Sequence, residues 1–314
     1  MLSTLEILLP VFALILAGFF CRRRNLLGPS AASELNRFVV WLALPALLFD
    51  TMAHSTWRQL DQPGFVATFS LACAGIFVLV LIARMLKGRH LADASIDAIA
   101  ASYPNTGYIG FPLGILAYGN ASLTPTTIAT IIVACVLFAV AIVLIEIGLQ
   151  SERAPHKLGL KVLKALAKNP LIVSPILGAL VSGAHAPLPQ SVETFLKLLG
   201  GAASPCALVS LGLFLAEKRP AGNARATSLL FTVVKLAVQP AFAWWMAAHV
   251  FALPPLEVDM AVLLAALPTG TGPYMLAEFY EREAHVTSQT ILFSTIASLA
   301  TLSVLLLLMQ RHGG

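Results

Sequence analysis

Residues 103–113 read YPNTGYIGFPL and lie inside an apolar run long enough to cross a membrane. Proline removes a backbone donor and clashes with the preceding turn, so Pro104 and Pro112 are expected to interrupt a helix here. No water reaches the bilayer core, so the backbone groups freed by such a break are costly to leave unpaired. The stretch therefore predicts a helix broken at membrane depth, which raises the question of what the break is for.

The composition is that of a membrane protein. Of the 314 residues 58% are hydrophobic and only 11% are charged, whereas a soluble domain carries roughly a quarter charged residues. The four cysteines lie far apart, without the spacing of a metal or redox pair. We expect an all-α polytopic protein with no metal, no cofactor and no nucleic-acid partner, although the net charge is +5.

A span needs about 20 mostly apolar residues. On that rule the sequence predicts ten spans, roughly 3–21, 35–53, 65–84, 95–119, 124–149, 169–185, 191–216, 226–251, 256–280 and 286–309.

Lysine and arginine gather in alternate loops of this arrangement. After the odd-numbered spans stand Arg22, Arg23, Arg24, Arg37, Arg84, Lys87, Arg89, Arg153, Lys157, Lys161, Lys164, Lys168, Lys218, Arg219, Arg225 and Arg282. The opposite side carries only Arg58 and Arg311. The positive-inside rule then predicts a multi-pass protein of the cell inner (cytoplasmic) membrane with both termini periplasmic or extracellular.

The two halves of the chain, 1–150 and 151–314, resemble each other. The stretch LPVFALILAGF of the first span is similar to NPLIVSPILGAL of the sixth, and the second and seventh spans each hold one central proline. YPNTGYIGFPL of the fourth span corresponds to LPTGTGPYM of the ninth, so that Pro104 and Pro112 match Pro268 and Pro273. Five spans per repeat is an odd number, which predicts two inverted five-helix repeats with broken crossover helices 4 and 9.

Inverted repeats with matched broken helices indicate a binding site near the bilayer midplane. The second half-helices, expected to start near Gly110 and Tyr274, would direct their positive N-terminal ends to the centre, which favours an anion. Asn105 adds an amide, and Thr106, Thr269 and Thr271 add hydroxyls. The competing interpretation is that proline and glycine only kink a packed helix. The predicted substrate-binding residues are Asn105, Thr106, Gly107, Thr269, Gly270, Thr271, Tyr274, Lys235 and Gln239.

Lys235 and Gln239 are four residues apart in the eighth span and so share one helix face. A charge at this depth is costly and usually faces the protein interior. Two roles stay open for Lys235: it could balance a dianionic substrate, or it could pair with an acid such as Asp259 or Glu278.

The sequence resembles the auxin efflux carrier family, which includes plant PIN-type auxin exporters and bacterial malonate or malate transporters. The resemblance covers essentially the full chain and rests on LPVFALILAGFFCRR at the start, LKALAKNPLIVSPILG in the second half and the two proline-rich breaks. It implies a fold similar to bile acid sodium symporters, with a scaffold of helices 1, 2, 6 and 7 and a mobile transport domain of helices 3–5 and 8–10. It also implies a homodimer and elevator-type movement.

Asn105 matches the asparagine of the PIN-type first crossover that contacts the substrate carboxylate. In the second crossover Thr269, Gly270 and Thr271 stand where PIN proteins have another asparagine, and residues 65–83 lack the acid and lysine that PIN proteins carry in the third span. These departures argue against auxin and favour a small aliphatic carboxylate such as malonate or malate.

The alternatives are a sodium-coupled organic anion symporter and an anion channel, and the coupling ion stays open between proton, sodium and none. Hydroxyls beside the crossovers could supply some sodium ligands, among them Thr126, Thr127, Thr130, Thr287, Ser288 and Thr290. An intramembrane enzyme would need paired aspartates, a HExxH helix or a serine activated by histidine. None of these occurs, so no enzyme activity is expected.

Overall fold

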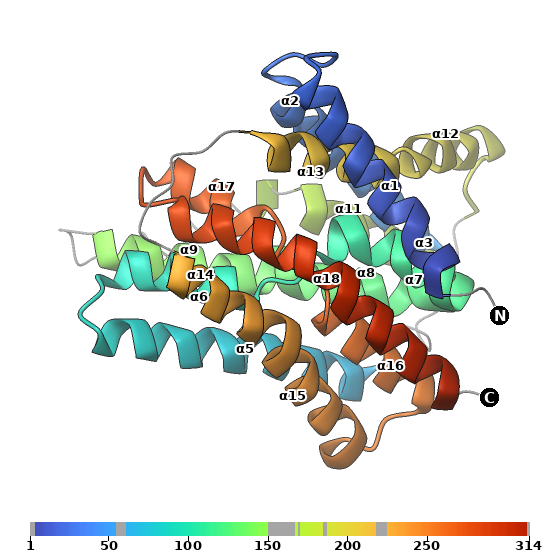
Figure 1. Cartoon of the computed structure of the whole chain (residues 1–314). Coiled ribbons are helices and arrows are strands. Elements are labelled where there is room, and N and C mark those ends of the chain that lie inside the picture. The colour runs from blue at the N-terminus through green and yellow to red at the C-terminus, as the bar shows by residue number, and fades with distance from the viewer. Residues whose placement is uncertain are drawn as a thin grey trace. The chain divides into compact units, whose positions relative to one another are not determined.

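The computed structural model describes residues 4–54, 61–149, 167–168, 170–184, 187–217 and 225–312. These residues form helices, with one isolated β-bridge and no strand (Figure 1). Six helical stretches within them are long and apolar enough to cross a membrane: Ala31–Ala53, Pro63–Leu86, Thr106–Leu149, Gln190–Ala216, Arg225–Val250 and His285–Met309. The chain is thus a mostly helical polytopic membrane protein, while the number of ten spans and the inverted repeat stay predictions. The basic loop at 151–166 lies outside the described residues.

The chain divides into two compact units that each draw on three separate stretches of sequence. Unit 1 comprises residues 1–62, 107–128 and 168–218, and unit 2 comprises residues 63–106, 129–167 and 219–314. Residues 107–128, which the family resemblance groups with the helices of a transport domain, pack with unit 1. One passage between the units falls between Thr106 and Gly107, directly after the first proline break.

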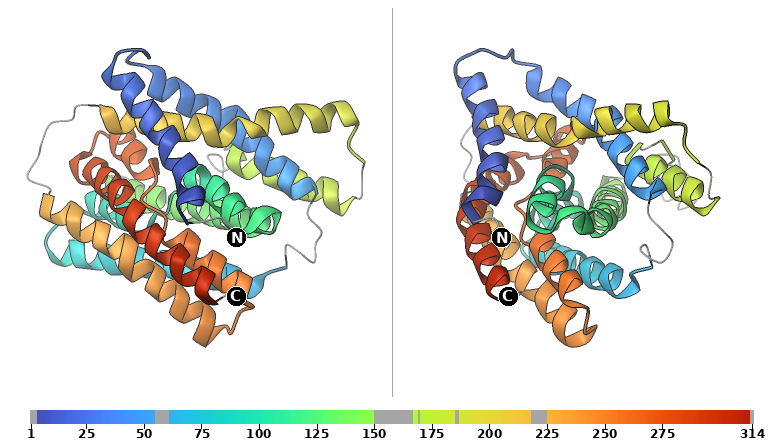
Figure 2. Two further views of the ribbon diagram at one scale, coloured as in Figure 1. Left: turned by 45° about the vertical axis from the view of Figure 1, so that its right-hand side comes forward. Right: turned by 90° about the vertical axis from the view of Figure 1, so that its right-hand side faces the viewer.

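Unit 1 is built on two pairs of crossing helices. Its elements are α1 (Thr4–Arg23), α2 (Ala31–Phe38), η1 (Val39–Ala43), α3 (Leu44–Ala53), η2 (Thr106–Gly110), α7 (Phe111–Tyr118), η3 (Gly119–Ser122), α8 (Leu123–Ile131), α11 (Pro170–Gly183), α12 (Gln190–Gly201) and α13 (Ala203–Ala216). Helix α1 packs on α13, and α3 runs beside α11 (Figure 2). Where α1 meets α13, a methyl group on Gly18 would overlap the carbonyl oxygen of Val209, and a methyl group on Gly212 would overlap the carbonyl oxygen of Ile15. Glycine is therefore what allows the two backbones to approach so closely.

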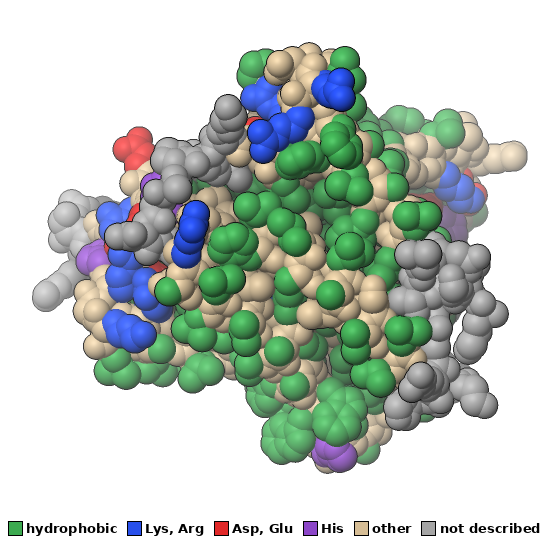
Figure 3. Space-filling view, in the orientation of Figure 1, with side chains coloured by type: hydrophobic (Ala, Val, Ile, Leu, Met, Phe, Trp, Pro, Cys, Tyr) green, Lys and Arg blue, Asp and Glu red, His purple; other side chains and the backbone are tan. Residues whose placement is uncertain are grey.

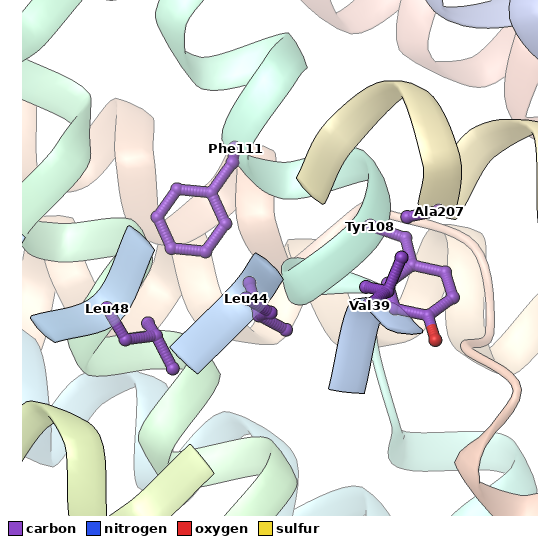
Figure 4. Packing of buried hydrophobic residues seen from close by; sticks show 6 residues of the cluster. All are labelled: Val39, Leu44, Leu48, Tyr108, Phe111 and Ala207. Atoms are coloured by element: carbon purple, nitrogen blue, oxygen red, sulfur yellow. The ribbon is translucent and has the colours of Figure 1, made fainter. Parts of the chain in front are cut away.

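A buried cluster in unit 1 explains why residues 107–128 belong to it. Figure 4 shows the side chains that pack together here, from η1, α3, η2, α7 and α13: Val39, Leu44, Leu48, Tyr108, Phe111 and Ala207. Tyr108 also donates a hydrogen bond from its hydroxyl to the side-chain oxygen of Asn36. The burial of Tyr108 and Phe111 stabilises the packing of this segment in unit 1, although the residues just before it in the sequence belong to unit 2. Burying one such side chain contributes about 1.5–3 kcal/mol.

Unit 2 contains both predicted proline breaks, while the part of the first interrupted helix that follows Thr106 belongs to unit 1. Its elements are α5 (Pro63–Leu86), α6 (Leu91–Ser102), η4 (Ile132–Leu137), α9 (Phe138–Leu149), α14 (Arg225–Val233), η5 (Val234–Val238), α15 (Gln239–Trp245), η6 (Met246–Val250), α16 (Pro255–Ala265), α17 (Gly272–Phe279) and α18 (His285–His312). Helix α6 packs on α5 and α9, α14 packs on α18, and α15 packs on α16. The helix before the first break is thus enclosed by continuous helices of the same unit.

Three π-helical segments end two residues before a proline: η1 before Pro45, η2 before Pro112 and η5 before Pro240. Proline offers no N–H to the carbonyl four residues earlier, so the preceding turn widens to bonds between residues five apart. In η5 the N–H of Gln239 accordingly donates to the carbonyl of Val234. This widened turn is the part of the eighth predicted span that contains Lys235.

Ion pairs connect the elements of unit 2 at one end, where α5 ends and α14 begins. Figure 3 shows lysine and arginine side chains gathered there. Arg84 of α5 contacts Asp97 of α6 at 2.7 Å, and Arg282 donates two hydrogen bonds to Asp93 at 2.7 and 2.6 Å. These pairs tie α6 to α5 and to the segment between α17 and α18.

Candidate functional site

Both predicted helix breaks are present. Helix α6 ends at Ser102 and helical structure resumes at Thr106, while α16 ends at Ala265 and α17 begins at Gly272. The first restart precedes the predicted Gly110 and the second precedes the predicted Tyr274 by two residues. Each break contains a proline, Pro104 or Pro268, which cannot donate the backbone hydrogen bond that would continue the helix.

The two breaks, at residues 103–106 and 266–271, pair with each other inside unit 2, and we call this junction the crossing. Pro104 and Thr269 form an isolated antiparallel bridge. The N–H of Asn105 donates to the carbonyl of Pro268 at 2.9 Å, and the N–H of Gly270 donates to the carbonyl of Tyr103 at 3.0 Å. Backbone groups that would be unpaired in a lone broken helix are thus satisfied by the other break, as a site away from water requires.

Side chains satisfy the carbonyl groups left free where the first half-helices end. Because residue 104 is proline, the carbonyl of Ala100 lacks its helical donor, and the hydroxyl of Thr269 supplies one at 3.0 Å. The carbonyl of Ser102, the last residue of α6, accepts from Nε2 of Gln239 at 3.1 Å. The carbonyl of Ala265, the last residue of α16, accepts from Nζ of Lys235 at 2.6 Å.

Lys235 is fully buried, and its hydrogen bond goes to a helix end rather than to a carboxylate. Of the two acids considered as partners from the sequence, Asp259 lies within α16, and the side chain of Glu278 is outside the described part of the chain. Lysine near a helix C-terminus bonds the last carbonyls and offsets the negative end of the dipole. This is a third role that the sequence did not indicate.

Asn105 lies in the crossing, and its side-chain amide nitrogen is buried there without a hydrogen-bond partner among the described residues. Its side chain is 4% exposed, and Nδ2 has no hydrogen-bond partner in the described part of the chain. Leaving a buried amide unpaired costs about 1–3 kcal/mol. A buried donor of this kind is available to an acceptor such as a water molecule, an ion or a ligand.

The other predicted residues fall into two groups. Thr106 and Gly270 are buried in the crossing, Thr271 and Tyr274 are half-buried beside it, and Pro273 occupies the first turn of α17. Gly107 and Pro112 belong to unit 1. The residues that the structure brings together in unit 2 are therefore Pro104, Asn105, Thr106, Lys235, Gln239, Pro268, Thr269 and Gly270.

Two contributors to the crossing were missed. Ser294 of α18 accepts from the N–H of Thr269 at 3.0 Å through its hydroxyl oxygen. Tyr103 lies against Gly270 in the break that follows α16. The centroid of its ring is 6.1 Å from the centroid of the Phe138 ring. No spacing in the sequence connects Ser294 to a segment 25 residues earlier. The signal for Tyr103 was its place in the quoted stretch.

Several hydroxyls considered as sodium ligands bond to their own helix. Those of Thr287, Ser288 and Thr290 donate to the carbonyl groups of Ala284, His285 and Val286. Among the described residues, no group of three or more histidine, cysteine or acidic side chains is placed to hold a metal ion.

A family model described as "Membrane transport protein" matches residues 3–306. The chain belongs to this family, the auxin efflux carrier family. It is 30% identical over 305 residues to the "Putative malonate transporter" of Rhizobium meliloti, covering 97% of this chain and 95% of that protein. It is also 24% identical to the "Uncharacterized transporter YfdV" of Escherichia coli, over 94% of both chains. The plant "Auxin efflux carrier component 8" of Arabidopsis thaliana is 20% identical over 93% of both. The resemblance read from the sequence is thus confirmed, and the protein is a membrane transporter.

Proposed function

We propose that this transporter is a secondary carrier of small organic anions with carboxylate groups, such as malonate or malate, and that the anion binds at the crossing in unit 2. The observation that carries the proposal is the buried amide of Asn105, whose Nδ2 lacks a partner in the described part of the chain. A carboxylate oxygen is the acceptor that such a donor binds most strongly. The name of the malonate transporter relative supports the same class of ligand.

The electrostatics of the crossing agree with an anion. Helix α17 begins at Gly272 in the second break, and a helix N-terminus carries a partial positive charge of about half a unit. The residues of the crossing itself, Tyr103–Thr106 and Ala266–Thr271, include no acid. A carboxylate would therefore meet donors and no repelling charge from these residues.

We also propose that unit 2 moves as a body relative to unit 1 during transport, in the manner of an elevator, and that the protein is a homodimer. The division of the chain into two units, each with its own packed helices, supports the first point. The predicted scaffold helices 1, 2, 6 and 7 fall in unit 1, and the breaks that pair with each other fall in unit 2.

The test is a titration of purified protein with malonate, followed by thermal shift, because a ligand of the folded state raises the melting temperature by mass action. Asn105→Ala should weaken binding about tenfold to a hundredfold, the equivalent of a hydrogen bond to a charged ligand. Asn105→Asp should weaken it further, since a second negative charge repels the anion. Asn120→Ala is the matched control, because Asn120 is exposed in η3. Unchanged affinity in folded Asn105 variants would place the site elsewhere.

A further inference from the structure

The helix face that contains Lys235 and Gln239 contacts the ends of both interrupted helices. Gln239 donates to the last carbonyl of α6 and Lys235 donates to the last carbonyl of α16, at 3.1 and 2.6 Å. Both side chains are fully buried. One turn of one helix therefore caps the ends of two half-helices, one of which lies 137 residues away in the sequence and the other 30.

We propose that Lys235 and Gln239 are positioning residues for the crossing and that Lys235 is its built-in cation, which acts on the anion through the end of α16 without touching it. This inference rests on the proposed anion site for its electrostatic half only. The positioning half stands on the two hydrogen bonds.

The physical reason for a cation at this place is the helix dipole. The C-terminal end of α16 carries a partial negative charge of about half a unit, and the break that follows it pairs with Asn105 through Pro268. An anion bound beside Asn105 would be repelled by an uncompensated helix end. In its ammonium form Lys235 would more than offset that partial charge, and its bond to the carbonyl of Ala265 keeps it at the helix end.

Gln239 performs the same positioning without charge. Its Nε2 also lies 3.4 Å from the sulfur of Cys73, and its Oε1 has no hydrogen-bond partner in the described part of the chain. The amide is thus directed at the end of α6 by one bond to the backbone and one contact to α5. Loss of Gln239 should loosen the first break and leave the charge at the second unchanged.

Hydrogen exchange tests the positioning half and needs no substrate. Lys235→Met should speed amide exchange in residues 262–270, and Gln239→Leu should speed it in residues 99–106. Lys87→Met is the matched control, because Lys87 is an exposed lysine of the same unit. If Lys235→Met exchanges like wild type in residues 262–270, the positioning role is overturned, whatever the substrate is.

Binding of two anions of different charge tests the electrostatic half. A charge interaction over roughly 10 Å at an effective dielectric constant of about 20 corresponds to a factor on the order of tenfold per unit charge. Lys235→Met should therefore weaken monomethyl malonate about tenfold and malonate, a dianion, about a hundredfold, whereas Gln239→Leu should weaken both by one common factor.

Lys235→Gln keeps a donor and removes the charge, which separates the two halves and replaces Lys235→Met if that variant fails to fold. It should show nearly wild-type exchange in residues 262–270 together with the charge-dependent loss of affinity. An equal loss for both anions in the Lys235 variants would overturn the role as a cation. Absence of carboxylate binding in wild type would instead refute the proposed function, and the exchange experiment would still decide the positioning role.

Discussion

Replacing Thr269 by valine tests how the crossing is held together. Thr269 is fully buried, and its hydroxyl donates to the carbonyl of Ala100 at 3.0 Å. That carbonyl has no helical donor, because the residue four positions later is Pro104. Valine has almost the same shape as threonine, so the variant leaves packing nearly intact and leaves one buried carbonyl unpaired. An unpaired buried acceptor costs about 1–3 kcal/mol of unfolding free energy.

For a chain of this size, such a loss lowers the melting temperature by roughly 2–5 °C. The measurement is thermal unfolding of the purified protein in detergent, with Thr232→Val as the matched control. The hydroxyl of Thr232 is also buried and donates to a carbonyl, that of Ser228, at 2.8 Å. Ser228 lies inside α14, where the backbone N–H of residue 232 already bonds to that carbonyl, so the control should change little. Equal shifts of the melting temperature in the two variants, or no shift in Thr269→Val, would refute the claim that the carbonyl of Ala100 depends on the hydroxyl of Thr269 for its hydrogen bond.

Three further predictions follow from single contacts and from the loop charges. Gly272→Ala places a methyl group 2.9 Å from a ring carbon of Tyr103, so we expect a loss of about 1–3 kcal/mol, partly recovered by Tyr103→Leu in a double-mutant cycle. The hydrogen bonds from Arg282 hold the pKa of Asp93 below its ordinary value, so this contribution to stability is complete above about pH 4 and disappears as the pH falls through the lowered pKa. Asp93→Asn should therefore lower the free energy of unfolding by about 1 kcal/mol at pH 7. The difference in unfolding free energy between this variant and wild type should vanish in acid. Reporter fusions should read as periplasmic at the C-terminus and as cytoplasmic in the loop at 151–168, and a cytoplasmic C-terminus would remove the inverted repeat.

The breaks could be predicted because proline acts locally. Pro104 and Pro268 each remove one backbone donor from their own helix, and the interruption that results lies within a few residues of the proline in the sequence. The partners of the freed carbonyl groups could not be predicted in the same way. A spacing of four residues placed Lys235 and Gln239 on one face, but nothing in the sequence states which helix ends lie opposite that face.

The division into units shows the same limit. The family resemblance groups all of the fourth helix with a transport domain, whereas residues 107–128 pack with unit 1. The reason is the burial of Tyr108 and Phe111 against Leu44 and Leu48, a tertiary effect that hydropathy cannot report. All six candidate spans among the described residues are apolar, so patterns of hydrophobicity distinguish membrane from loop and not one span from another.

The placement of charge within unit 2 connects these observations. Its arginine–carboxylate pairs, such as Arg84 with Asp97, tie helices together at one end, while the crossing relies on backbone groups, hydroxyls and the amides of Asn105 and Gln239. A guanidinium at the crossing would be left as an uncompensated buried charge each time an anion departed, and that costs several kcal/mol. A neutral amide pays only the smaller penalty of an unpaired donor. Lys235 lies away from the contact groups and is bonded to the negative end of α16 through the carbonyl of Ala265. Neutral contact groups, with the proposed cation Lys235 set back at a helix end, are therefore suited to a site that must bind and also release its ligand.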